Sequence, residues 1–237
     1  MRIGAVSYRC RNKDIDFNLS QIERALKETE GKVDLLCFPE AFLQGFDSLC
    51  WDYEIDKKIA CTQDGEAIGR LKDLSLEYGV ALLTGYIERE KEKIYSSCIV
   101  IDKGEIVHNY RRISRGWKEF DQTDDHYDEG TDTSCFVLND TRISLALCGD
   151  LWDQPERFEK GHLLLWPVFL SFPLEMWEES ELKEYTKHAS SICDYTLMFN
   201  PIDPDTGSHG GSFCFHDEKI LDRIAFDEEG VLIWQAV

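Results

Sequence analysis

Short apolar runs alternate with amphipathic stretches in the first ninety residues of the chain. Apolar runs of strand length are separated by a stretch in which Leu19, Ile22 and Leu26 recur at helical spacing. The same unit then repeats once, so the order strand, helix, strand, helix, strand is predicted. The predicted strands are residues 2–7, 33–38 and 80–86, and the predicted helices lie within residues 18–31 and 65–79.

The pattern changes to β-hairpins in the middle of the chain and returns to mixed elements after about residue 153. Lys103-Gly104 and Asn139-Asp140 are turn dipeptides between apolar or alternating runs. The predicted hairpins are 94–102 with 105–110 and 135–138 with 142–148; a helix over 179–194, a strand over 195–200 and two late strands within 213–226 follow. A mixed sheet system covered by helices fits this order best.

Length and charge limit the classes of protein that the chain can represent. A chain of 237 residues with 43% hydrophobic residues can bury a sizeable core, and no linker interrupts it, so a single domain over residues 1–237 is expected. The net charge of -20 disfavours a nucleic acid or an anionic membrane as partner. No apolar run approaches the ~18 residues of a membrane span, and the N-terminal run is too short for a signal peptide. We therefore expect a cytoplasmic protein.

The nine cysteines are scattered and mostly embedded in apolar runs, which is typical of free buried thiols in a reducing compartment. No CxxC pair occurs, and Cys214 with His216 supplies too few ligands for zinc. We therefore expect no structural zinc site.

Three predicted strand ends carry reactive side chains: Glu40 after VDLLCFP, Arg112 after EIVHNYR, and Cys148 after ISLAL. A partly desolvated carboxylate suits a general base, and a cysteine before a turn and a helix start can have its thiolate favoured by backbone N–H groups. A nearby cation can hold an oxyanion. Together these are the groups that acyl transfer requires.

Each of these residues also has an ordinary structural interpretation. Cys148 can be core packing, Glu40 a partner of a helix N-terminus and Arg112 a surface hairpin residue. The acidic tract of residues 121–132 is interpreted as a solvated loop.

The ordered motifs resemble the carbon-nitrogen hydrolases of the nitrilase superfamily. CFPEAF, NYRRIS and ALCGDLWDQPE are similar to the family's glutamate, lysine and cysteine motifs, with Arg112 where lysine is usual, and Glu119 in GWKEF is similar to a second glutamate of the family. The resemblance implies an α/β fold, a four-layer α-β-β-α sandwich that commonly forms a homodimer, without metal or cofactor.

The resemblance also implies roles for these residues. Glu40 is the general base, and Cys148 is the nucleophile that forms a thioester with a small-molecule amide. Gly149 N–H and Arg112 hold the oxyanion, and Glu119 helps to orient the water. The product is an acid, with release of ammonia or an amine.

Arginine in place of lysine leaves alternatives open. Guanidinium is larger and planar, and it can pair with Glu40 or Glu119 and silence them, which favours a non-catalytic nitrilase-like binding protein. Acyl transfer to an amine is a third possibility on the same fold. The candidates for an apolar substrate pocket are Phe42, Trp117, Trp152 and Trp166.

Overall fold

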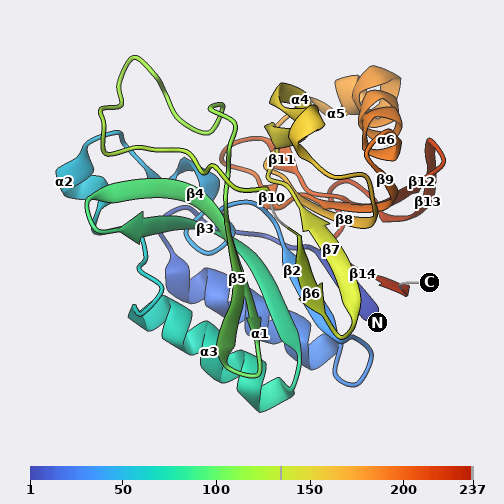
Figure 1. Ribbon diagram of the computed structural model, residues 1–237, viewed down its shortest axis with the longest axis horizontal. Helices are drawn as coiled ribbons and strands as arrows, with labels where there is room; N and C mark the ends of the chain where they lie inside the picture. Colours follow the sequence, from blue (N-terminus) through green and yellow to red (C-terminus); the bar gives the residue numbers. More distant parts are fainter. Residues whose placement is uncertain (134, 236–237) are drawn as a thin grey trace.

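Two six-stranded mixed sheets form the centre of the protein in the computed structural model, which describes residues 1–133 and 135–235. The strand order is β14-β1-β2-β3-β4-β5 in the first sheet and β13-β12-β9-β8-β7-β6 in the second. A small β10-β11 ladder lies outside them. Figure 1 shows the sheets between the helices α1 and α3 on one side and the helices α4 to α6 on the other.

The strands are β1 (Arg2–Ser7), β2 (Leu35–Phe38), β3 (Ala81–Glu90), β4 (Lys93–Asp102), β5 (Glu105–Arg111), β6 (Phe136–Leu138), β7 (Thr141–Leu145), β8 (Gly161–Pro167), β9 (Cys193–Phe199), β10 (Ile202–Asp203), β11 (Ser208–His209), β12 (Ser212–His216), β13 (Lys219–Ile224) and β14 (Gly230–Gln235). The α-helices are α1 (Ile15–Glu28), α2 (Tyr53–Asp56), α3 (Glu66–Tyr78), α4 (Asp150–Asp153), α5 (Leu174–Met176) and α6 (Leu182–Ser190). Two 3₁₀ turns (Phe46–Ser48 and Pro155–Arg157) and a π-helical turn (Trp177–Glu181) complete the elements.

Two hydrophobic cores hold these layers together. Leu19, Ile22 and Leu26 of α1 are buried with side chains of α3 and the outer face of the first sheet. The inner faces of both sheets share the second core, which continues to Tyr185 and Ala189 where α6 contacts β9 and β12. The predicted four-layer sandwich is therefore confirmed.

Helix α1 begins earlier than its apolar stripe alone indicates. Asp14 caps it by accepting a hydrogen bond from the Phe17 N–H at 3.0 Å. The observed helix covers residues 15–28 rather than 18–31, because this cap fixes the first turn.

Several predicted boundaries in the second half are wrong. Cys193 and Asp194 belong to strand β9 and not to the preceding helix, because parallel pairing of Cys193 with Gly161 outweighs the helical pattern. The strand predicted over 142–148 ends at Leu145, and the chain turns before Cys148. The sequence pattern also failed to single out β8, a run buried on both faces, and β14, which pairs antiparallel with β1.

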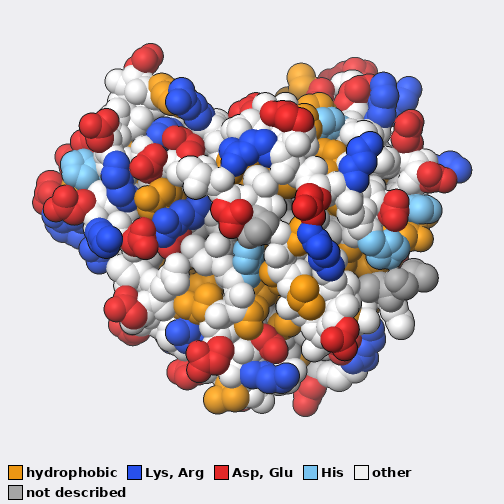
Figure 2. Space-filling view, in the orientation of Figure 1, with side chains coloured by type: hydrophobic (Ala, Val, Ile, Leu, Met, Phe, Trp, Pro, Cys, Tyr) orange, Lys and Arg blue, Asp and Glu red, His pale blue; other side chains and the backbone are white. Residues whose placement is uncertain are grey.

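The surface carries both signs of charge. Figure 2 shows acidic and basic side chains interspersed on one face, and an outline indented between the loop of residues 113–130 and the part that carries α4 to α6. The acidic tract 121–132 lies in that loop, without helix or strand, as predicted.

Among the described residues, we find no helix that combines the length and apolar character needed to cross a membrane.

Candidate functional site

Glu40 lies at the end of β2 and is completely buried. Its Oε1 atom accepts a hydrogen bond from Ser96 Oγ at 2.9 Å and another from Arg112 Nη1 at 2.9 Å. Its Oε2 atom is buried without a hydrogen-bond partner among the described protein atoms. One carboxylate oxygen is therefore fixed, and the other is left to accept a proton.

The backbone at Glu40 depends on a glycine in the neighbouring strand. Gly85 of β3 donates its N–H to Pro39 O at 3.0 Å. A Cβ atom at Gly85 would lie 2.6 Å from Glu40 Cα and would also clash with backbone atoms of Pro39 and Ala41. Only glycine allows β3 to approach the Glu40 turn this closely.

Arg112 follows β5 and is 3% exposed. Its backbone N–H donates to Ser96 O at 2.8 Å, which continues the pairing of β5 with β4. Its Nε atom donates to Ser114 Oγ at 2.7 Å, and its Nη1 atom donates to Glu40. Arg112 therefore does not lie on the surface, and its guanidinium plane is fixed by two oxygen atoms.

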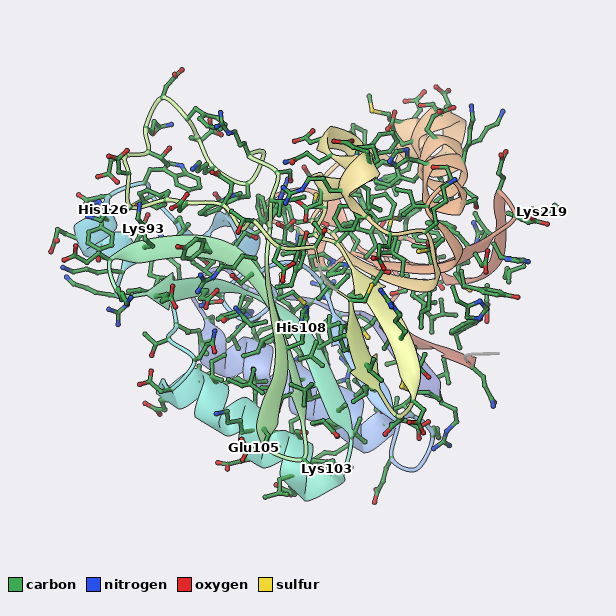
Figure 3. The ribbon with its side chains drawn as sticks, in the orientation of Figure 1. Lys93, Lys103, Glu105, His108, His126 and Lys219 are labelled. Atoms are coloured by element: carbon green, nitrogen blue, oxygen red, sulfur yellow. The ribbon has the colours of Figure 1, made fainter. Side chains whose placement is uncertain are left out.

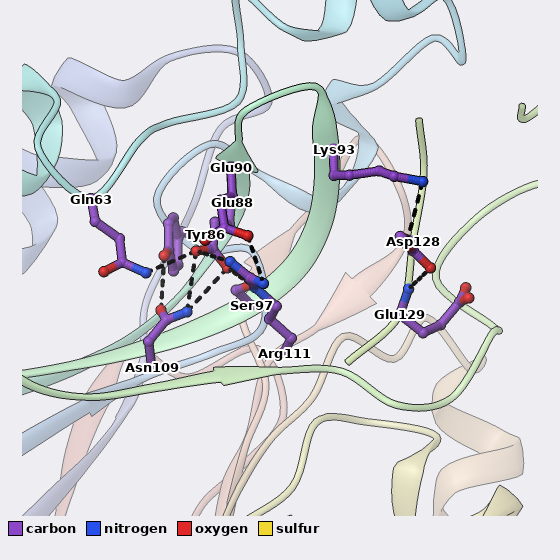
Figure 4. Close-up of polar contacts among 10 residues, drawn as sticks. All are labelled: Gln63, Tyr86, Glu88, Glu90, Lys93, Ser97, Asn109, Arg111, Asp128 and Glu129. Carbon is purple, nitrogen blue, oxygen red and sulfur yellow. Dashed lines mark hydrogen bonds and ion pairs between the residues drawn. The ribbon is translucent and has the colours of Figure 1, made fainter. Parts of the chain in front are cut away.

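The neighbouring Arg111 points to the opposite face of the sheet. Figure 4 shows its guanidinium against Glu88, to which Nε and Nη2 donate at 2.8 and 2.9 Å. Ser97 and Asn109 also donate to Glu88. Since successive strand residues alternate between faces, Arg111 is held on the outer face and Arg112 faces the other sheet.

Strand β5 runs from the β-turn toward α4. Lys103 and Glu105 lie at the turn in Figure 3, with His108 farther along the strand. Arg112 follows at the other end of β5, in the part of the molecule where β7 also ends.

The Nη2 atom of Arg112 lies beside the turn that carries Cys148. A Cβ atom at Gly149 would be 2.7 Å from Nη2, so glycine leaves the space that the guanidinium fills. Within the described part of the chain, neither Nη2 nor the Gly149 N–H has a hydrogen-bond partner. Two unpaired donors therefore lie close together next to the cysteine.

Cys148 adopts a left-handed backbone conformation, with φ of 42°, which is uncommon outside glycine. Its N–H donates to Pro167 O at 3.0 Å, and its carbonyl accepts from Trp166 Nε1 at 2.9 Å. The thiol lies 3.6 Å from Phe169 O. The turn is thus held from both sides, while the residue as a whole is only half-buried.

The resting thiol of Cys148 is neutral. Burial raises the pKa of Cys148 to about 12, and the Glu40 carboxylate adds to this rise, whereas Arg112 opposes it. The expectation that a helix start would favour the thiolate is wrong, because α4 is only four residues long and burial dominates. Attack by this sulfur therefore needs a base to remove its proton.

Arg112 stays charged in this environment. Burial on its own lowers the pKa of Arg112, but the nearby charges, Glu40 first among them, raise it above its ordinary value. The site thus holds a buried ion pair, 2.9 Å between Arg112 Nη1 and Glu40 Oε1, beside a neutral thiol.

The family model of the carbon-nitrogen hydrolases matches residues 2–155. The chain belongs to this family. It is 25% identical over 146 residues to a glutamine-dependent NAD(+) synthetase from Thermotoga maritima, which covers 60% of this chain and 24% of that protein. It is 24% identical over 151 residues to an (R)-stereoselective amidase from a Pseudomonas species, which covers 64% of this chain and 52% of that protein. The chain thus matches about half or less of the length of these relatives.

A solved structure supports the fold assignment. It is a glutamate-to-glutamine mutant of the amidase from Nesterenkonia sp. AN1, which shows Michael addition of acrylamide at the active-site cysteine. The TM-score is 0.79 at 21% identity, with 100% of this chain and 93% of that chain covered.

Glu119 lies apart from the buried cluster. It is exposed in the loop after Arg112, and among the described contacts its side chain makes none with Glu40, Arg112 or Cys148. Its backbone oxygen accepts from Gln122 and Thr123. The structure therefore gives Glu119 no direct contact with these three residues.

The four pocket candidates lie in different surroundings. Phe42 is fully buried between the first sheet and its helices, 5.3 Å from Phe38, so core packing explains it. Trp166 is also fully buried and supports the Cys148 carbonyl. Trp152 is exposed and stacks on His188. Trp117 is buried in a cluster that includes Ala41, the residue after Glu40.

Sequence reasoning missed several residues of this cluster. Ser96 and Ser114 orient Glu40 and Arg112, and Phe169 stacks on Phe46 at 4.2 Å beside the thiol. Ser114 follows Arg112 by two residues, so its position near Arg112 could have been predicted from the sequence. The contacts of Ser96 and Phe46 depend on tertiary packing, which no local pattern reveals.

Proposed function

We propose that this protein is a cysteine-dependent hydrolase of a non-peptide carbon-nitrogen bond in a small carboxamide or a related compound. The observation that carries the proposal is the buried Glu40 carboxylate, with Oε1 bound to Arg112 and Ser96 and Oε2 unpaired, next to the neutral Cys148 thiol. The amidase relative and the acrylamide adduct on the cysteine of the Nesterenkonia amidase support the same chemistry.

In the first half of the reaction, Glu40 Oε2 removes the proton from Cys148 Sγ, and the sulfur attacks the amide carbon. The new oxyanion accepts hydrogen bonds from the Gly149 N–H and Arg112 Nη2. As the carbon-nitrogen bond breaks, Glu40 gives its proton to the departing nitrogen. Ammonia or an amine leaves, and a thioester on Cys148 remains.

In the second half, Glu40 removes a proton from water, which attacks the thioester carbon at the position that the amine has left. The carbon-sulfur bond then breaks, and Glu40 returns the proton to the sulfur. The acid leaves, and Cys148 is again a neutral thiol. Glu119 takes no part in these steps, because its side chain is exposed in the loop.

A non-catalytic binding protein is the second candidate, and the Glu40–Arg112 ion pair favours it. A guanidinium that engaged both carboxylate oxygens would leave no base. In this chain Arg112 engages only Oε1, and its Nε atom is directed to Ser114. The unpaired Oε2 atom favours the enzyme.

The test is a screen for ammonia release from small carboxamides, N-carbamoyl compounds and nitriles, with Cys148→Ala as the control. We expect turnover of at least one compound by the wild type and none by Cys148→Ala. Added amine acceptors distinguish acyl transfer from hydrolysis. If the wild type releases no ammonia but binds the same compounds that Cys148→Ala binds, the result favours the binding protein.

A further inference from the structure

Asp150 is a completely buried carboxylate that follows the Cys148-Gly149 turn. Its Oδ1 atom accepts hydrogen bonds from the N–H groups of Ile113 at 3.0 Å and Ser114 at 2.8 Å. Its Oδ2 atom accepts from Tyr110 OH at 2.6 Å and from the Leu147 N–H at 2.9 Å. Both oxygens thus have two donors each.

These four donors come from two segments that belong to different sheets. Tyr110, Ile113 and Ser114 lie at the end of β5 in the first sheet, on both sides of Arg112. Leu147 lies after β7 of the second sheet, directly before Cys148. A single side chain therefore ties the segment with the cation to the turn with the thiol.

The contacts continue from Asp150 to the guanidinium. Ser114 donates its N–H to Asp150, and its Oγ atom accepts the hydrogen bond from Arg112 Nε at 2.7 Å. The position of Ser114 thus sets the plane of the guanidinium, whose Nη2 atom lies against Gly149. Displacement of Ser114 would move Arg112 relative to Cys148.

A carboxylate is the group that these donors require. It offers two oxygen atoms and no proton, so each can accept two hydrogen bonds. In asparagine one oxygen becomes an NH₂ group, which would face either the Ile113 and Ser114 N–H groups or the Leu147 N–H. At least one buried backbone donor would then lose its acceptor.

We propose that Asp150 is a positioning residue, which acts through Ser114 and Leu147 to hold the Arg112 guanidinium against the Cys148-Gly149 turn. This inference rests on the proposed function only in taking Cys148 as the nucleophile. Asp150 touches no reacting atom; it fixes the distance between groups that do, where small displacements are costly.

The test uses Asp150→Asn in the full chain and compares alkylation of Cys148 by iodoacetamide with that of Cys50, an exposed thiol in the same protein. The titratable groups that act on Cys148 include Glu40, Arg112 and Tyr185. Arg112 lowers the thiol pKa. Its displacement therefore reduces the thiolate fraction at neutral to mildly alkaline pH.

We expect Asp150→Asn to slow Cys148 alkylation about tenfold, because the displaced guanidinium no longer favours the thiolate, while alkylation of Cys50 is unchanged. On an identified substrate, kcat should fall about 10- to 100-fold with little change in KM. The matched control is Asp153→Asn, an exposed aspartate of the same helix, which should behave as the wild type.

Ser114→Ala keeps all backbone donors to Asp150 but removes the acceptor of Arg112 Nε, so it should slow Cys148 alkylation in the same direction even if Asp150→Asn does not fold. If Cys148 is alkylated at the wild-type rate in a folded Asp150→Asn variant or in Ser114→Ala, the positioning role is overturned. A wild-type Cys148 that does not react at all contradicts the proposed function instead.

Discussion

Replacement of Arg112 by lysine tests how this site uses an unusual cation. The guanidinium donates to Ser114 Oγ and Glu40 Oε1 and places a third nitrogen beside Gly149. A lysine ammonium ends in a single nitrogen, so it cannot reach all three positions at once. Arg112→Lys should therefore keep the charge and lose part of the geometry.

The size of the effect follows from the contacts that are lost. One hydrogen bond to a charged group contributes about 1.5–3 kcal/mol, so Arg112→Lys should reduce kcat by at least about tenfold. Arg112→Ala removes the oxyanion donor altogether, which costs about 3 kcal/mol or a factor of roughly a hundred in rate. It also leaves Glu40 buried without its cation, which should lower the free energy of unfolding by about 3–5 kcal/mol.

A double-mutant cycle with Gly149→Ala makes this assay specific to the guanidinium. In the wild type, the new Cβ atom would lie 2.7 Å from Arg112 Nη2 and should displace it. In the Arg112→Lys background that nitrogen is absent, so the same substitution should cost less. We expect kcat values for ammonia release that are clearly non-additive, because the two residues are in contact.

The result that refutes this reasoning is an inert wild type together with activity gained in Arg112→Lys. That outcome would identify Arg112 as a disabling replacement and the protein as a binder. Additive costs of Arg112→Lys and Gly149→Ala would show instead that Nη2 does not depend on the space at Gly149.

Three further predictions concern the surroundings of the site. Glu40→Gln should abolish ammonia release and leave the fold intact, because the amide keeps the shape of the carboxylate but cannot accept the thiol proton; ammonia release near the wild-type rate would contradict this. Arg111→Met should lower the free energy of unfolding in urea at neutral pH by about 3 kcal/mol. Burial alone raises the pKa of Glu88, but Arg111 and Ser97 lower it overall. The difference in unfolding free energy between the wild type and Arg111→Met should therefore shrink as pH falls through the carboxylate range. A difference that does not change with pH would argue against the ion pair. Gly85→Ala should lower the free energy of unfolding by about 1–3 kcal/mol and reduce activity. Gly69→Ala in α3 is the control, because its added Cβ meets open space and should not destabilise the fold. Equal losses of unfolding free energy in the two variants would contradict a tight contact between Gly85 and the Glu40 backbone.

The layers of the fold were predictable because local patterns dominate them. The stripe of Leu19, Ile22 and Leu26 packs on the first sheet as its spacing indicates. The turn at Lys103-Gly104 closes the β4–β5 hairpin as predicted. Strand β8 was not singled out, since a run buried on both faces lacks the alternation that distinguishes strand from helix.

The site was predictable only in part, because its contacts join segments far apart in the sequence. Motif order pointed to Glu40, Arg112 and Cys148, and the strand alternation explains why Arg112 rather than Arg111 faces Glu40. Proximity in motif order failed for Phe42, which follows Glu40 by two residues yet packs on the opposite side of the sheet. Asp150 escaped notice because its role depends on four donors that only the tertiary structure assembles.

The division of the site between two sheets explains why such a residue is needed. Glu40 and Arg112 follow strands of the first sheet, whereas Cys148 follows a strand of the second. The packing between the sheets is apolar, and apolar contacts are not directional. The hydrogen bonds of Asp150 cross that boundary and are directional, so they can fix a distance that packing alone leaves adjustable. On the proposed function, an arginine can then serve where the family's lysine is usual, since Ser114 and Gly149 hold its larger group in one place.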